Sequence, residues 1–107
     1  MTLYFYIDII WGDRMEFRWN EWNVEHVWKH GVYPAEAEAV VLGARRPYPI
    51  YRGDGKYLVW GPGKGGRLLQ VIYLLEADEL MYVIHARPLT DGEKRQLMRR
   101  RRRRGER

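Results

Sequence analysis

The sequence predicts a small α+β domain built on an antiparallel sheet. Two helical segments lie close together within residues 20–43, and three strand-like segments follow one another within residues 56–87. Helices and strands that are segregated along a chain are typical of α+β proteins. We expect the element order β-β-α-α-β-β-β-α, with the first two helices packed on one face of the sheet, the other face open, and a helix at the C-terminus.

The first segment predicts a β-hairpin. Residues 3–11 alternate in hydrophobicity with a period of two, Gly12 and Asp13 form a turn, and residues 15–19 return as a second strand. The apolar run is short and contains Asp8, which argues against a signal peptide or a membrane span. We interpret residues 1–14 as an added N-terminal strand.

Capping residues set the limits of the first two helices. Asn20 is a good N-cap, and the helix is expected to run to about His30, where Gly31 ends it. Pro34 fits the first turn of a second helix, because its missing N–H is not needed there. Gly43 ends that second helix.

Apolar spacing predicts which helix faces are buried. In the second helix, Ala37, Val40 and Val41 form a narrow apolar stripe. In the first helix, the predicted buried face consists of Val24, Val27, Trp28 and Gly31. The polar stripe beside it consists of Asn23, His26 and His30.

The second half of the chain predicts an antiparallel meander. Residues 44–54 contain two prolines and read as a loop or an irregular edge strand. Residues 56–60, 67–75 and 80–87 are strand-like and are joined by short polar connections. Thr90 and Glu93 then form a capping box, although the helix that follows offers only Leu97 and Met98 as apolar contacts.

The net charge of +5 comes from one end of the chain. Residues 99–107 contain seven arginines and one glutamate, so residues 1–98 are nearly neutral. We expect a single domain over residues 1–98 and a basic tail over residues 99–107. Such a tail is either a solvated charge run or an arm that binds phosphates. The absence of cysteine excludes disulfides and thiolate metal sites, and it fits a cytoplasmic protein.

Strand alternation suggests a site for metal-independent RNA cleavage. It places Met81, Val83, His85 and Arg87 on one face of the last strand, and leaves Tyr82, Ile84 and Ala86 for the core. RNA cleavage needs an acid and a base, which histidine supplies, and cations around the phosphate. The candidates are His85, Arg67 and Arg87, with Lys29 or His30 as a further donor. The alternatives are a salt bridge from Arg87 to Glu93 and a half-buried surface role for His85.

A zinc site is the weaker interpretation of the histidines. His26 and His30 have the i,i+4 spacing of zinc-binding helices. The H-E-x-x-H motif has Glu after its first histidine, but Val27 stands there, and no third ligand is evident. We therefore predict neither a metal nor another cofactor.

Several ordered motifs resemble the BrnT family. They are W-N-E-W-N-V-E-H-V-W-K-H-G-V-Y-P-A-E-A-E, then G-K-Y-L, G-R-L-L-Q-V and H-A-R-P-L-T-D-G-E, and they cover residues 15 to about 97. The resemblance implies a RelE-like fold and a toxin of a type II toxin–antitoxin pair, which cleaves RNA and is blocked by a ribbon-helix-helix antitoxin. It carries the family's functional positions onto Arg67, Arg87, His30, Thr90 and Glu93.

This sequence also departs from the family pattern. Residues 3–11 are added, the arginine tail is longer than usual, and His85 stands where Ser or Thr is common. The residues predicted to contact RNA are Thr90, Glu93, Arg46, Lys64, Arg99 and Arg100.

Two functions follow as expectations. The first is a cytoplasmic endoribonuclease toxin that inhibits translation and forms a hetero-oligomer with its antitoxin, without a membrane partner. The second is a non-catalytic member of the same fold that binds RNA or a protein.

Overall fold

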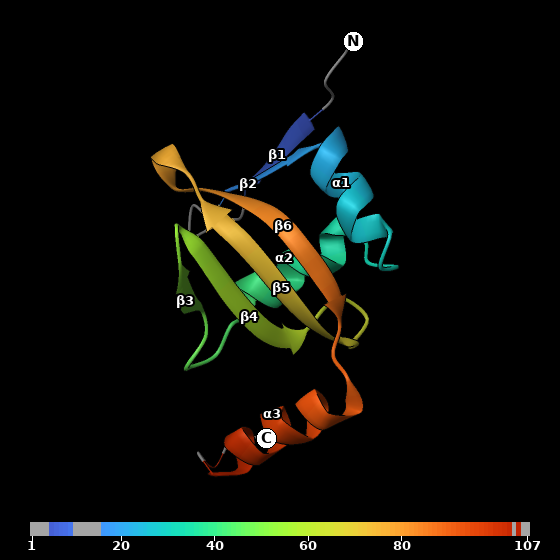
Figure 1. The fold of residues 1–107 in the computed structure, drawn as a ribbon, viewed down its shortest axis with the longest axis vertical. Coiled ribbons are helices and arrows are strands. Elements are labelled where there is room, and N and C mark those ends of the chain that lie inside the picture. The colour runs from blue at the N-terminus through green and yellow to red at the C-terminus, as the bar shows by residue number, and fades with distance from the viewer. Residues whose placement is uncertain (1–4, 10–15, 104, 106–107) are drawn as a thin grey trace.

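A six-stranded mixed sheet forms the centre of the molecule (Figure 1). The computed structural model describes residues 5–9, with their backbone only, 16–103 and 105. The strand order is β1-β2-β6-β5-β4-β3. The strands are β1 (Phe5–Ile9), β2 (Glu16–Asn20), β3 (Ile50–Gly53), β4 (Lys56–Pro62), β5 (Leu68–Leu75) and β6 (Leu80–Pro88).

The α+β class and the predicted meander are confirmed. β4, β5 and β6 pair antiparallel in sequence order, and β3 adds the irregular edge strand. The expectation of a wholly antiparallel sheet is wrong, because β2 pairs with β6 in parallel over Glu16–Arg18. A parallel pair needs a long crossover connection, and here the chain between β2 and β6 contains two helices and three strands. The predicted turn at Gly12 and Asp13 lies outside the described residues.

The helices begin where their caps predict. They are α1 (Glu21–Trp28), α2 (Pro34–Leu42) and α3 (Asp91–Arg103), and a short 3-10 turn (Ala77–Glu79) precedes β6. Helix α2 ends at the predicted Gly43, whereas α1 ends at Trp28, before the predicted end at about His30. The Asn20 side chain accepts from the N–H of Asn23 at 3.2 Å, and Gly31 has a φ of 74°, the left-handed conformation that favours glycine. None of the helices among the described residues is long and apolar enough to cross a lipid bilayer.

Helix α2 covers one face of the sheet, behind β4 and β5 in Figure 1. Its predicted stripe of Ala37, Val40 and Val41 is fully or almost fully buried. The stripe belongs to the same apolar cluster as Val59 of β4 and Val71 of β5. Burial of these side chains supplies the main favourable free energy for closing this layer.

Helix α1 lies along β6, next to the end of β2 (Figure 1). It therefore does not share evenly with α2 the single layer that the sequence predicts for the two helices. Asn23 is fully buried, and its Nδ2 donates to the carbonyl oxygen of Val83 at 2.9 Å. Asn23 therefore supplies a hydrogen-bond donor to the backbone of β6 just past the point where β2 stops pairing. This contact turns the helix so that Trp28 is 53% exposed. The prediction of Trp28 on the buried face is therefore wrong, and Asn23 of the predicted polar stripe is buried instead.

A β-bulge in β6 changes which side chains face the core. Ile72 pairs with His85 but Tyr73 pairs with Val83, so Ile84 has no partner of its own. Met81, Val83 and Ala86 consequently belong to the buried cluster. Of the predicted core set of Tyr82, Ile84 and Ala86, Ala86 is in the cluster, and Tyr82 is buried but lies outside the cluster. Ile84 is only partly buried, and simple alternation fails here because it does not allow for the extra residue.

The opposite face of β6 carries the polar side chains. The register pairs Arg87 with Gln70 and His85 with Ile72, both on the face away from the buried Val71–Ala86 pair. His85 and Arg87 share a face, as the sequence indicated. Helix α3 continues to Arg103, so the first five arginines of the predicted tail are helical.

Candidate functional site

Arg67 lies on the α2 side of the sheet, just before β5. Its Nε and Nη2 donate to the two carboxylate oxygens of Glu36 at 3.1 and 2.8 Å. Its Nη2 also donates to the carbonyl oxygen of Gly31 at 2.7 Å. The guanidinium lowers the pKa of Glu36, chiefly through these hydrogen bonds. Arg67 therefore joins the β4–β5 hairpin to the loop between α1 and α2.

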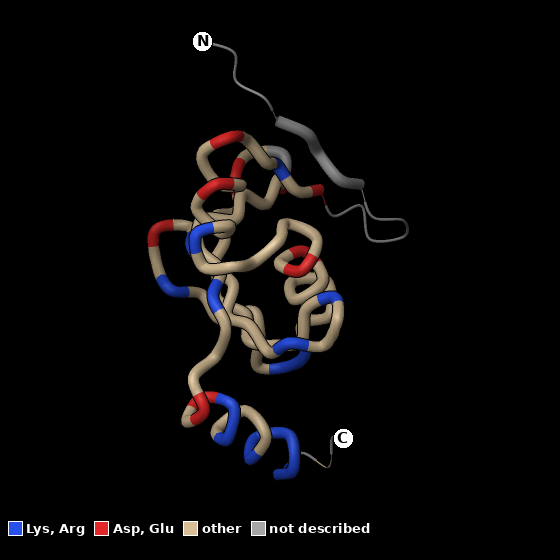
Figure 2. The backbone as a smooth tube through the Cα atoms, turned by 90° about the vertical axis from the view of Figure 1, so that its right-hand side faces the viewer, with Lys and Arg blue, Asp and Glu red and all other residues tan. Residues whose placement is uncertain are grey.

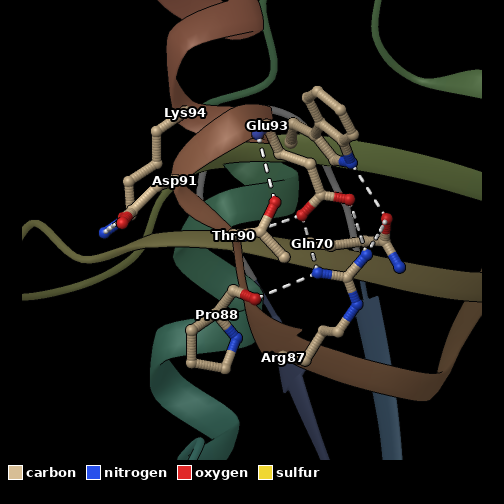
Figure 3. A network of polar contacts seen from close by, with 8 residues as sticks. Gln70, Arg87, Pro88, Thr90, Asp91, Glu93 and Lys94 are labelled. Atoms are coloured by element: carbon tan, nitrogen blue, oxygen red, sulfur yellow. Dashed lines mark hydrogen bonds and ion pairs between the residues drawn. The ribbon is translucent and has the colours of Figure 1, made fainter.

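Arg87 lies on the other face and is bound on all four of its terminal N–H groups (Figure 3). Nη1 donates to Glu93 at 2.8 Å and to the carbonyl oxygen of Pro88 at 3.0 Å. Nη2 donates to Glu93 at 2.9 Å and to the side chain of Gln70 at 3.2 Å. The convergence of Arg67 and Arg87 on one patch, which the sequence suggested, is wrong. The salt-bridge alternative for Arg87 is what the structure contains.

Thr90 and Glu93 form the predicted capping box of α3. The N–H of Thr90 donates to Glu93 at 2.8 Å, and the N–H of Glu93 donates to the Thr90 hydroxyl at 3.1 Å. The hydrogen bond from Arg87, followed by the one from Thr90, lowers the pKa of Glu93 to about 2. Both side chains are thus occupied within the protein, and they position α3 instead of presenting free groups to RNA.

His30 and His85 come together from different elements. Their ring centroids are 5.7 Å apart and the rings are tilted by 60°. His30 follows α1, whereas His85 lies on β6 next to the bulge. Because α1 runs along this strand, it carries the histidine that precedes Gly31 directly to His85.

The surroundings of His85 favour its neutral form. Burial lowers the pKa of His85, and the nearby charges of His30, Arg87 and His26 lower it further. Its Nε2 is buried and has no hydrogen-bond partner among the described residues. A buried polar atom without a partner is rare in a folded protein, and a catalytic role is one explanation for it.

Aromatic rings extend this pair along α1. Trp22 stacks on His26 with centroids 4.9 Å apart and the planes within 9°. Its ring also lies 6.4 Å from that of Tyr82, and the guanidinium of Arg18 lies 4.0 Å above the Tyr82 ring. His26 and His30 are 6.3 Å apart, so these contacts connect Arg18 to the histidine pair.

The same row continues beyond Arg87 to α3. Gln70, which accepts from Arg87, also accepts from the indole N–H of Trp60 at 3.0 Å. The guanidinium of Arg100 lies 5.7 Å from the Trp60 ring. We call this row of rings and cations the ring stripe; its members are Arg18, Tyr82, Trp22, His26, His30, His85, Arg87, Gln70, Trp60 and Arg100.

The remaining predicted residues take different places. Lys29 is exposed and follows Trp22 and His26 at i+7 and i+3, so it continues their side of α1. Lys64 is exposed in the β4–β5 hairpin, which packs against Glu36 of α2 at Gly63. Arg46 is exposed in the loop before β3. No contact in the described part of the chain joins Lys64 to the ring stripe.

The zinc interpretation gains no further ligand. Within the described ranges, no three or more His, Cys, Asp or Glu side chains are grouped to hold a metal ion. The ring contacts of His26 and His30 are with Trp22, with each other and with His85.

Five members of the ring stripe were not identified from the sequence: Arg18, Trp22, Tyr82, Gln70 and Trp60. Trp22 carried a signal, because it precedes His26 and His30 at i,i+4,i+8 spacing, which places all three on one side of a helix. Tyr82 is buried as the sequence predicts, but the bulge turns it to the face away from the apolar cluster. Gln70 and Trp60 join through strand register, which a single sequence does not specify.

Comparisons of the chain with protein-family models, characterised proteins and solved structures found no match. The resemblance to the BrnT family therefore stays an expectation from the sequence.

Proposed function

We propose that this protein binds single-stranded RNA along the ring stripe and cleaves it at His30 and His85 without a metal. The carrying observation is the 5.7 Å separation of these two imidazoles on the face of the sheet that α2 leaves uncovered. Two imidazoles at this separation can serve as the acid and the base that transesterification of RNA requires.

In the proposed reaction, His85 acts as the base. Its lowered pKa keeps the ring unprotonated, so it can take the proton of the RNA 2′-hydroxyl. The 2′-oxygen attacks the adjacent phosphorus, the bond from phosphorus to the 5′-oxygen breaks, and His30 donates a proton to that leaving oxygen. The products are a 2′,3′-cyclic phosphate and a free 5′-hydroxyl. Since Nε2 of His85 is buried, side chains around it must move before the substrate reaches this nitrogen.

The negative charge that develops on the phosphate must be stabilised by a cation, and Lys29 is the candidate. It is exposed and adjoins His30 in the sequence, whereas Nε and Nη2 of Arg67 and the terminal N–H groups of Arg87 donate to protein acceptors. A developing negative charge is stabilised most by donors that are already in place.

The rings of the stripe support binding of unpaired bases. Trp22 is 56% exposed although it stacks on His26. Arg18 and Arg87 of the stripe are ion-paired with Glu76 and Glu93, so its rings are the groups that face the bases. Aromatic rings bind single-stranded nucleic acid by stacking, with little dependence on sequence. In line with the BrnT resemblance, we further propose that the protein acts as a toxin that a ribbon-helix-helix antitoxin neutralises.

One observation favours the second candidate, a non-catalytic RNA-binding protein. Arg87 is saturated by Glu93, Pro88 and Gln70, so it offers no free terminal N–H to a phosphate. In this case the ring stripe binds RNA and leaves it intact.

A single experiment separates the two functions. Purified protein is mixed with an end-labelled, unstructured RNA in the presence of a chelator, and with a matched strand in which every sugar is 2′-deoxy. The proposed activity cleaves only the RNA and leaves cyclic phosphate ends. Retention of both strands on the protein without cleavage would favour the binding function instead.

A further inference from the structure

Arg100 of α3 contacts the rest of the domain, whereas four other arginines of this helix are exposed to solvent. Arg100 donates to the Tyr48 hydroxyl at 2.7 Å and lies against the Trp60 ring. Arg95, Arg99, Arg102 and Arg103 are exposed. Figure 2 shows the basic residues gathered along this helix, at the C-terminal end of the molecule.

Spacing places three of the exposed arginines on one side of α3. Arg95, Arg99 and Arg102 stand at i,i+4,i+7, which is one face of a helix. A surface hollow of about 310 Å³ is lined by these three together with Lys94 and Met98. We call Lys94, Arg95, Arg99, Arg102 and Arg103 the basic face.

Helix α3 is held against the domain at three points along its length. Glu93 binds Arg87 in the first turn, Leu97 is buried, and Arg100 contacts Tyr48 and Trp60. Two of these points, Arg87 and Trp60, belong to the ring stripe. The basic face is therefore positioned where the stripe ends, and it extends about 14 Å from Lys94 to Arg103 at the rise of an α-helix.

We propose that the basic face of α3 binds the phosphate backbone of the RNA strand that occupies the ring stripe, several nucleotides away from the cleaved bond. This inference rests on the proposed RNA binding and adds the requirement for a long strand. Guanidinium groups fit phosphate oxygens through paired hydrogen bonds, and a run of them gives affinity that does not depend on sequence.

The composition of α3 favours RNA over a membrane surface. Helices that lie in the bilayer interface bury a broad apolar face, but α3 exposes one large apolar side chain among its described residues, Met98. Continuity with the ring stripe favours RNA over an acidic protein, because the same strand can stack on the rings and pair with the arginines.

The test compares the full-length protein with two double variants. Arg99→Gln with Arg102→Gln removes two charges from the basic face and keeps residues that favour helix. Arg52→Gln with Lys56→Gln removes two exposed charges at the β3–β4 edge and serves as the matched control. Each protein is titrated with RNA strands of about 4 and about 16 nucleotides over a range of salt concentrations.

We expect the α3 variant to lose affinity for the long strand about tenfold or more, while its affinity for the short strand and its cleavage rate at saturating RNA stay unchanged. Its slope of log affinity against log salt should fall by about 1.4 for the long strand, from about 0.7 per lost phosphate contact. The control should match the wild type.

Equal behaviour of the α3 variant and the control on the long strand overturns the inference even if RNA is cleaved. Binding of the α3 region to anionic vesicles, with no preference for the long strand, overturns it as well. Long-strand binding that needs Arg99 and Arg102 without any cleavage supports the inference and counts against the proposed catalysis alone.

Discussion

Arg87 and Glu93 form a two-point ion pair, with N···O distances of 2.8 and 2.9 Å, that joins the end of β6 to the first turn of α3. Replacing Glu93→Gln keeps a side chain that can cap Thr90 but removes the charge. Because the pair is partly exposed, we expect a loss of about 1 kcal/mol in unfolding free energy, and faster hydrogen exchange of α3 amides. Unchanged protection of α3 in the variant would show that Leu97 and Arg100 hold the helix alone.

The same pair should respond to acid. The pKa of Glu93 is lowered from 4.5 to about 2 in the folded protein, so its contribution is complete above pH 4.5 and is lost as the pH falls toward 2. The stability difference between wild type and Glu93→Gln should therefore shrink over this window. Urea denaturation of both proteins measures it, and a difference that does not depend on pH would argue against the ion pair.

His85 should make the protein less stable as the pH falls below 6.5. Burial, His30, Arg87 and His26 lower its folded-state pKa, so the unfolded chain takes up the proton first. The free energy of unfolding then decreases as the pH falls, and above 6.5 the effect is absent. His85→Gln should flatten this dependence between about pH 8 and about pH 5. A variant with the same slope as the wild type would assign the dependence to other groups.

Asn23 should be the most sensitive polar position in the described core. Its side chain donates to Val83 at 2.9 Å and accepts from the N–H of Asn20 at 2.7 Å. Asn23→Leu is similar in size but leaves both backbone groups without these partners, and we expect a loss of about 2–3 kcal/mol. Chemical denaturation measures the loss. Glu25→Gln, on the exposed side of the same helix, should change stability by less than about 0.5 kcal/mol.

Two tryptophans of α1 provide a matched test of the ring stripe. Trp22 and Trp28 are 56% and 53% exposed, but Trp22 stacks on His26 whereas Trp28 packs edge-on against Tyr33. Trp22→Ala should weaken binding of single-stranded RNA by about 1–3 kcal/mol, the usual value of one stacked base. Fluorescence anisotropy measures the affinity, and Trp28→Ala should leave it unchanged. Equal losses in both variants would contradict the assignment of the stripe.

Local signals made much of the fold predictable. Asn20, Gly31, Pro34 and Gly43 each act within a few residues of the chain, so the helix limits could be predicted without tertiary information. The parallel contact between β2 and β6 is different, because no local signal records which strands pair across more than 50 residues.

The candidate site was harder to predict because it depends on one extra residue and on two ion pairs. The bulge at Ile84 turns Tyr82 to the outer face, whereas Ala86 stays on the core side as predicted. Glu36, which binds Arg67, comes from a distant segment of the chain. Glu93, which binds Arg87, follows the turn after β6. A basic strand residue looks the same in sequence whether a phosphate or a carboxylate meets it.

The most direct measurement of the central claim is the single-turnover rate of RNA cleavage for three histidine variants in the presence of a chelator. His30→Gln and His85→Gln should each slow cleavage by about 10²–10⁴-fold, the usual contribution of a general acid or base. His26→Gln, a histidine of the same cluster outside the close pair, should cleave at nearly the wild-type rate. Wild-type rates in the His30 and His85 variants, or no cleavage by the wild-type protein, would contradict the proposed function.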